Sequence, residues 1–262
     1  MKIGDARVVL RPRSIAEIFE LALRWQATHA GALYLRLGAL CLLPCFALCL
    51  WSRYLGEEDW GYIWMMAMVM ALGLQGIFTV ANSLLFFDED VTVRKVFAHL
   101  RRRLGPHIGT LLWCAVLLIG TGLTVFLLPL FCVAAIFTYE ASLLEGQGVF
   151  EAVRRSGRMV RGMVAHSLGL CMGLSAAAVT FVIVSEVLGQ GFIQLLDLPP
   201  VFGNLFEDGG SMMALMGLFA SIPFITGARF LTYIDNRTRR DGWDVQVRLM
   251  ALAASIDRRE GV

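Results

Sequence analysis

The sequence is short of charge and lacks the motifs that many enzymes carry. Charged residues make up 17% of its 262 residues and apolar residues 57%, whereas about a quarter of the residues in soluble domains are charged. It contains no nucleophile elbow, no His-Glu-x-x-His motif, no phosphate-binding glycine loop and no Cys-x-x-Cys pair. These absences argue against a soluble fold and against the corresponding enzyme classes. We therefore expect no enzymatic activity, no catalytic residue and no cofactor.

The positions of the cysteines and the net charge narrow the possible classes of protein further. All six cysteines fall inside apolar runs rather than in loops, which argues against a disulfide framework. The net charge is only +2, so the overall charge gives no indication of a nucleic-acid partner.

Five long apolar runs dominate the chain, and they cover residues 33–51, 62–87, 108–144, 163–188 and 212–234. A transmembrane helix needs about 20 residues, so the run over 108–144 is too long for one crossing. Gly120, Gly122 and Pro129 interrupt this run, and we expect two short helices that meet near residues 127–129. The sequence therefore predicts an all-α membrane protein with six transmembrane helices.

The basic residues lie on one side of this six-span arrangement. Apart from Arg53, every lysine and arginine lies before the first span, after the second, fourth or sixth, or at the adjoining end of a span. Cytoplasmic segments are enriched in these residues, so we expect both termini in the cytoplasm. The predicted regions are a cytoplasmic segment with an amphipathic helix (1–32), a membrane domain (33–234) and a cytoplasmic C-terminal segment (235–262).

The cytoplasmic segments have amphipathic patterns. Ser14 and Glu17 form a capping box, and the apolar residues that follow predict a helix with one apolar face. This helix either lies among lipid headgroups or packs on the protein's own cytoplasmic face. A further amphipathic helix is expected over 245–256, with Trp243 at the membrane interface.

A loose internal repeat is also visible. Apolar–Phe pairs at 18–19, 96–97 and 149–150 are each followed by arginines and then by a glycine. This pattern indicates three units, each an amphipathic helix followed by a transmembrane hairpin. Chance similarity between segments of like composition is the alternative.

Three segments resemble a known family. They are 14–24 with its Ile-x-x-Ile-Phe pattern, 144–156 with Leu-Glu-Gly-Gln-Gly-Val-Phe, and 231–249 with Arg-Arg-Asp-Gly-Trp-Asp. Together they resemble bacterial membrane proteins grouped with the membrane domain of glycerophosphoryl diester phosphodiesterases, over essentially the whole chain. The resemblance implies a multi-pass protein of the bacterial inner membrane and supplies no catalytic residues.

Cys41, Cys45 and Cys49 recur at every fourth residue of the first apolar run. On a helix they share one face, so they could offer soft thiolate ligands to a metal such as copper(I). Cysteine also behaves as a small apolar residue, and no histidine or methionine motif accompanies these three. We therefore favour packing over a metal site.

Gly169 and Gly173, flanked by Ala165 and Ala177, form a stripe of small residues on the fifth expected span. Such stripes let membrane helices approach closely. We favour packing inside the bundle, and a homo-oligomer contact is the alternative.

Six polar side chains interrupt the apolar runs, and a buried charge in a membrane span is a functional candidate. They are Arg36, Gln75, Asn82, Glu140, Glu186 and Arg229. Arg36, Glu140 and Arg229 lie near expected cytoplasmic ends, where long side chains can reach water, and Glu140 could pair with either arginine. Glu186 is expected to reach water at the outer end, Asn82 lies near the cytoplasmic interface, and Gln75 is the one deep amide.

These observations favour a non-enzymatic scaffold that docks another membrane or cytoplasmic protein and contacts membrane lipids. A small transporter or channel is the second hypothesis, although the polar groups are sparse for a transport path. A lipid-handling enzyme or accessory protein is the third.

Overall fold

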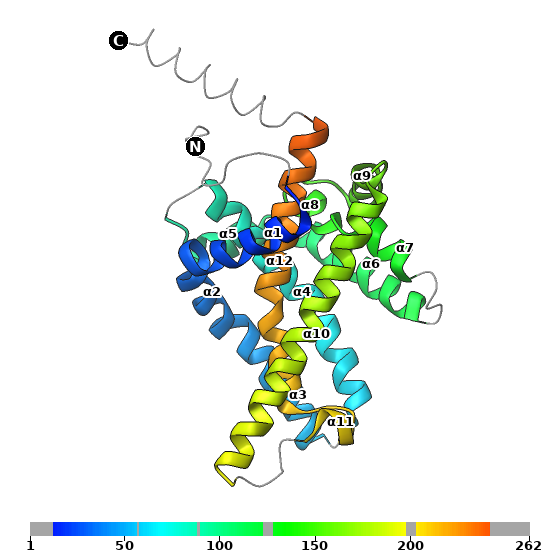
Figure 1. Cartoon of the computed structure of the whole chain (residues 1–262). Helices are drawn as coiled ribbons and strands as arrows, with labels where there is room; N and C mark the ends of the chain where they lie inside the picture. Colours follow the sequence, from blue (N-terminus) through cyan, green and yellow to red (C-terminus); the bar gives the residue numbers. More distant parts are fainter. Residues whose placement is uncertain (1–12, 57, 88–89, 123–127, 198–202, 242–262) are drawn as a thin grey trace.

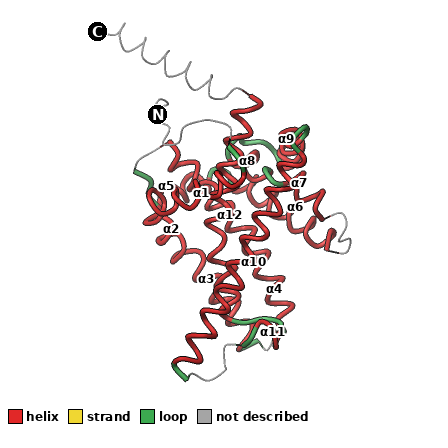
Figure 2. The backbone as a smooth tube through the Cα atoms, viewed as in Figure 1, coloured by secondary structure: helices red, strands yellow, loops and turns green. Residues whose placement is uncertain are grey.

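The computed structural model describes residues 13–56, 58–87, 90–122, 128–197 and 203–241, and all regular secondary structure in these residues is helical (Figures 1 and 2). The all-α prediction is therefore confirmed for this part of the chain. The expected helix over 245–256 and Trp243 lie outside the described residues.

The first helical segment is continuous from Ile15 to Tyr54 but changes direction along its length. It comprises α1 (Ile15–Trp25), a π-helical turn (Gln26–Ala30), α2 (Gly31–Leu37), a second π-helical turn (Gly38–Leu42) and α3 (Leu43–Tyr54). Figure 1 shows α1 lying across the molecule while α2 and α3 run steeply away from it. The first π-helical turn joins α1 to α2, where the helical segment changes direction. π-Helical turns interrupt the regular hydrogen bonding of an α-helix.

The predicted capping box at the start of α1 is present. The Ser14 hydroxyl accepts a hydrogen bond from the Glu17 N–H, and the Ser14 N–H donates to the Glu17 carboxylate at 2.9 Å. The apolar face of α1 packs on the protein itself, because Ile18, Ala22 and Trp25 are buried and α1 contacts α10 and α12. Of the two predicted positions for this helix, the structure supports the one on the protein's own surface.

Two other short helices have a similar place in the chain. α5 (Val93–Arg101) follows α4 (Trp60–Phe87) and precedes α6 (Leu104–Gly122), while α9 (Val149–Val160) precedes α10 (Val164–Leu195). Figure 1 shows α1, α5, α8 and α9 at one end of the molecule and α11 (Leu205–Asp208) at the opposite end. The short helices at this end carry Arg24, Arg94, Arg101, Arg154, Arg155 and Arg158.

The long helix α12 (Met212–Asp241) forms the centre of the bundle, with α1, α4 and α10 packed against it. Its buried apolar side chains run along its length, and they include Leu215, Phe219, Ile222, Phe230 and Tyr233. The helix continues through residue 235 without a break, so the predicted domain boundary there does not coincide with a helix end.

Four helical segments are long and apolar enough to cross a membrane, and they cover Ile15–Tyr54, Trp60–Phe86, Val164–Leu195 and Met212–Arg239. The two helices expected as the third and fourth spans are shorter. α7 (Leu128–Ala135) and α8 (Thr138–Leu143) are separated by a break, and at 1.5 Å per residue the eight residues of α7 extend about 12 Å. The described residues are therefore all-helical in their regular structure and include four candidate membrane spans, and the six-span count is not confirmed.

Candidate functional site

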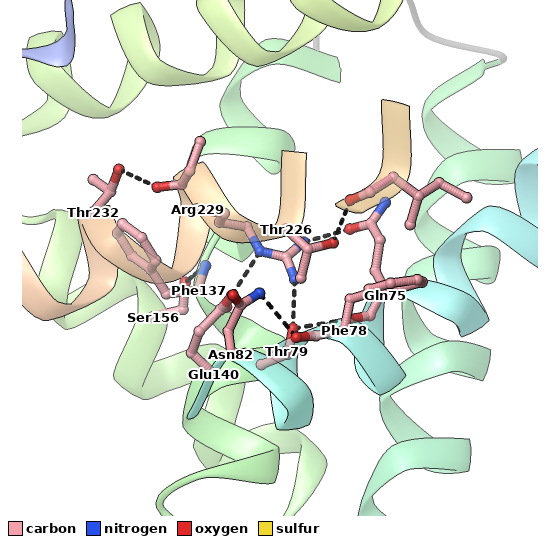
Figure 3. Close-up of polar contacts among 12 residues, drawn as sticks. Gln75, Phe78, Thr79, Asn82, Phe137, Glu140, Ser156, Thr226, Arg229 and Thr232 are labelled. Atoms are coloured by element: carbon pink, nitrogen blue, oxygen red, sulfur yellow. Dashed lines mark hydrogen bonds and ion pairs between the residues drawn. The ribbon is translucent and has the colours of Figure 1, made fainter. Parts of the chain in front are cut away.

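A network of buried polar side chains surrounds Arg229 on α12. Its Nε donates to Glu140 Oε1 on α8 at 2.7 Å, its Nη2 donates to Thr79 Oγ1 at 3.2 Å, and its Nη1 donates to Gln75 Oε1 on α4 (Figure 3). The guanidinium also lies 5.3 Å from the centre of the Tyr139 ring. Arg229 is 6% exposed and Glu140 is fully buried, so this ion pair lies inside the protein rather than reaching water as expected from the sequence.

The α4 side of the network is a polar stripe. Gln75, Thr79 and Asn82 are spaced at i, i+4 and i+7 and therefore share one face of the helix. The fully buried Asn82 Oδ1 accepts hydrogen bonds from Trp25 Nε1 at 3.3 Å and from the Tyr34 hydroxyl. Asn82 thus fixes α1 and α2 to α4.

Glu140 is held in place by an unusual local backbone. α8 is six residues long and every one of them is buried, and the break at Ile136 and Phe137 separates it from α7. The Ser156 hydroxyl on α9 accepts from the Phe137 N–H at 3.1 Å and donates to the Ala134 carbonyl at 2.7 Å. A side chain from a neighbouring helix therefore satisfies backbone groups that the break releases, as membrane proteins require where a helix is interrupted.

A cavity of ≈ 240 Å³ lies beside this network. Its polar lining consists of Gln75, Tyr139, Ser175 and Arg229, and the remaining wall is apolar or formed by cysteine. Two oxygen atoms close to this site are buried without a hydrogen-bond partner among the described residues, namely Glu140 Oε2 and the Tyr139 hydroxyl. The site therefore combines the Arg229–Glu140 ion pair with two oxygen atoms that have hydrogen-bonding capacity to spare.

Glu186 belongs to a separate arrangement near the other end of the molecule. It is 1% exposed and accepts hydrogen bonds from Gln190 Nε2 at 3.0 Å, from the Leu205 N–H at 2.9 Å and from the Ser211 hydroxyl. These contacts connect α10 to the chain that leads into α12. The expectation that Glu186 reaches water is therefore wrong, because neighbouring backbone and side chains enclose it.

The remaining predicted residues lie apart from the network. Arg36 on α2 is exposed. Of the two arginines predicted as partners for Glu140, Arg229 forms the ion pair. Cys49 is buried, and Cys41 and Cys45 are half-buried. No cluster of three histidine, cysteine or acidic side chains in the described part of the chain is arranged to hold a metal ion. The structure thus gives the thiolate alternative no support.

The glycine stripe on α10 is covered by α1. A Cβ atom on Gly173 would lie 2.8 Å from Phe19 Cζ, and one on Gly169 would lie 3.0 Å from Ile15 Cδ1. The close approach that these glycines permit is therefore made within one chain. This contact supports the predicted packing role over a homo-oligomer contact through the same stripe.

Sequence reasoning missed Thr79, Ser156 and Tyr139. The signal for Thr79 was available, because it completes the regular spacing between Gln75 and Asn82. Ser156 gave no comparable signal, since its role depends on a helix break 19 residues earlier in the chain.

In its described residues, the chain is a bundle of helices with four candidate membrane spans and a buried ion-pair network. No family model matches the chain, and no curated protein or solved structure shows significant similarity to it.

Proposed function

We propose that this chain is a non-enzymatic membrane scaffold that presents its arginine-rich end to a partner protein. The observation that carries the proposal is the internal hydrogen bonding of Arg229, the buried cation at the centre of the bundle. Glu140, Gln75 and Thr79 receive its hydrogen bonds, so the charge fixes α4, α8 and α12 to one another. A network of this kind favours a rigid support over a site that exchanges ligands.

The proposal includes a definite orientation. Both chain ends and the basic short helices lie on the cytoplasmic side, because basic residues are retained there. The four long helices cross the bilayer, and the segment from α6 to α8 starts and finishes on that same side. In the six-span form this segment also crosses twice, and the loose three-unit repeat and the resemblance to bacterial inner-membrane proteins are consistent with that form.

Labelling can separate these two forms of the proposal. In a variant without native cysteines, a new cysteine is placed at position 125. A membrane-impermeant reagent added outside the cell should label it only if the segment from α6 to α8 crosses the bilayer twice. Cysteines at Arg94 and Arg154 should react only from the cytoplasmic side in either form. Reaction of those two positions from outside would overturn the orientation itself.

Photo-crosslinking in native membranes tests the docking role. A crosslinker placed at the exposed Arg94 on α5 should capture one recurrent protein, whereas the same group at the exposed Val187 on α10 should not. The two positions form a matched pair, because Val187 lies on a long apolar helix that we assign to contact with lipid. Repeated recovery of the chain alone from both positions would contradict the scaffold role.

A small transporter is the second candidate, and the buried Glu140 Oε2 without a hydrogen-bond partner among the described residues favours it. A carboxylate oxygen beside a cavity is a site where a proton or polar solute could bind. Solute flux into liposomes that contain the purified protein, abolished by Glu140→Gln, would support this candidate. Equal leakage in empty liposomes would remove it.

A further inference from the structure

The end of the molecule that carries α9 contains a basic hollow for which the scaffold proposal names no ligand. The hollow has a volume of ≈ 670 Å³, and its lining residues are Gln147, Glu151, Arg154, Gly157, Arg158 and Arg161. The three arginines are exposed and spaced at i, i+4 and i+7, which places Arg154 and Arg158 on one face of α9 and Arg161 at its C-cap. Three cations therefore surround one concave surface that contains a single carboxylate.

The middle of this hollow is kept open by Gly157. A Cβ atom at this position would meet nothing within 4 Å, so the glycine is not required for helix packing. Its lack of a side chain leaves room between Arg154 and Arg161, where an ordinary side chain would partly fill the hollow. The helix thus has both the charge and the space for a bound group.

The arginines of α9 have two distinct roles. Arg155 points toward the protein, where its Nε lies 3.1 Å from Glu145 Oε2, and the Tyr233 hydroxyl donates to the same carboxylate. The buried residues of α9 are Ala152, Ser156, Met159 and Val160. Docking of α9 therefore depends on this inner face, and the three arginines of the hollow lie outside it.

The hollow lies at the boundary between apolar and polar surface. Arg161 is followed by Gly162, which has φ of +90°, and by Met163, and then the apolar helix α10 begins with the exposed Val164. At the other end of α9, Phe150 is 69% exposed and its ring lies 5.5 Å from that of Trp113 on α6. Exposed apolar and aromatic side chains on both sides place α9 at the level of lipid headgroups.

We propose that Arg154, Arg158 and Arg161 bind the phosphate of an anionic membrane phospholipid in this hollow. Guanidinium groups form paired, charge-assisted hydrogen bonds with phosphate oxygens, and a phosphate also reduces the repulsion between like charges at i and i+4. Glu151 at the edge of the hollow can accept a hydrogen bond from a headgroup hydroxyl. The site is independent of the scaffold role, because it requires no protein partner.

Native mass spectrometry of the full-length protein, purified in detergent and supplied with phosphatidylglycerol or phosphatidylcholine, measures lipid retention directly. The native chain should retain phosphatidylglycerol in preference to phosphatidylcholine. A variant carrying Arg154→Gln, Arg158→Gln and Arg161→Gln should bind phosphatidylglycerol roughly a hundredfold more weakly, since each basic residue at an anionic surface contributes a factor of about five. A matched variant with Arg94→Gln, Arg101→Gln and Arg102→Gln removes the same charge from α5 and should retain the lipid.

Gly157→Leu provides a test that changes no charge. The leucine side chain should occupy the hollow and weaken phosphatidylglycerol binding while thermal stability is kept, because its Cβ meets open space. Equal loss of lipid in the α5 and α9 triple variants would overturn the site, since binding would then follow net charge alone. Retention of lipid by both the α9 triple variant and Gly157→Leu would also overturn it. Binding of inorganic phosphate without any preference for phosphatidylglycerol would assign the hollow to a free anion and reject the lipid.

Discussion

Two buried glutamates at separate places in the bundle are stabilised in different ways. Glu140 forms an ion pair with Arg229, yet its second oxygen has no hydrogen-bond partner among the described residues. Glu186 accepts from two side chains and one backbone N–H, none of which carries a charge. The first carboxylate therefore depends on a single cation from a distant helix, and the second depends on several neutral donors from nearby chain.

This difference indicates what each glutamate fixes. The partner of Glu140 is 89 residues away in the sequence, so the ion pair holds α8 to the central helix. The donors to Glu186 lie within 25 residues of it, so that cluster shapes one connection between α10 and α12. Loss of the first should affect the whole bundle, whereas loss of the second should remain local.

The largest effect is expected from Arg229→Met. This change leaves Glu140 as a buried charge without its cation, which costs about 3–5 kcal/mol of unfolding free energy. Denaturant unfolding in detergent micelles measures the loss. Arg24→Met is the matched control, because Arg24 pairs with Glu20 across exposed side chains, and surface pairs contribute about 1 kcal/mol or less. Equal losses in the two variants would refute the central role of the buried pair.

A smaller effect is expected from Glu186→Ala. The Ser211 hydroxyl, the Gln190 amide and the Leu205 N–H would lose their acceptor, and unsatisfied buried groups cost about 1–3 kcal/mol. Hydrogen exchange should rise in residues 203–211 and stay unchanged around α8. Glu186→Gln keeps one acceptor oxygen and should show a weaker change. Increased exchange throughout the bundle would show that the cluster is not local.

The smallest effect is expected at His99 and concerns the dependence of folded stability on pH. Burial, together with the nearby Arg103 and Arg102, lowers the pKa of His99 on α5 below its ordinary value of 6.5. The unfolded chain then takes up a proton first as the pH falls below about 6.5, so folded stability should decline toward lower pH. His99→Asn should flatten this part of the profile. An unchanged profile would show that His99 does not contribute to the pH dependence of folded stability.

Much of the helical architecture could be predicted from the sequence. Unbroken apolar runs predicted the long helices α4, α10 and α12, because the length of a membrane span follows from bilayer thickness. The capping residues Ser14 and Glu17 correctly predicted the start of α1, since that signal is contained within one turn. The glycines of α10 predicted close packing but did not identify α1 as the helix that approaches them.

The network was harder to predict, because it joins residues 75, 140 and 229 from three distant segments. Hydropathy placed Glu140 and Arg229 near helix ends and so favoured contact with water. The packing of α8 against α4, α6 and α9 instead buries Glu140, and Arg229 is buried beside it. The interruption between α7 and α8 was hidden for the same reason. The sequence identifies residues that disfavour a helix. It does not show which side chain will hydrogen-bond to the backbone groups left without helical partners at the break.

The hydrogen bonds of Ser156 connect α9 to the break between α7 and α8. If α9 shifted outward, the Phe137 amide and the Ala134 carbonyl would lose their shared partner in a region without water. The chain between them would then have to rearrange, and Glu140 lies only three residues beyond Phe137. Tension applied to α9 would thus reach the charged centre of the bundle through the Ser156 hydroxyl, as well as through the contact of Arg155 with Glu145.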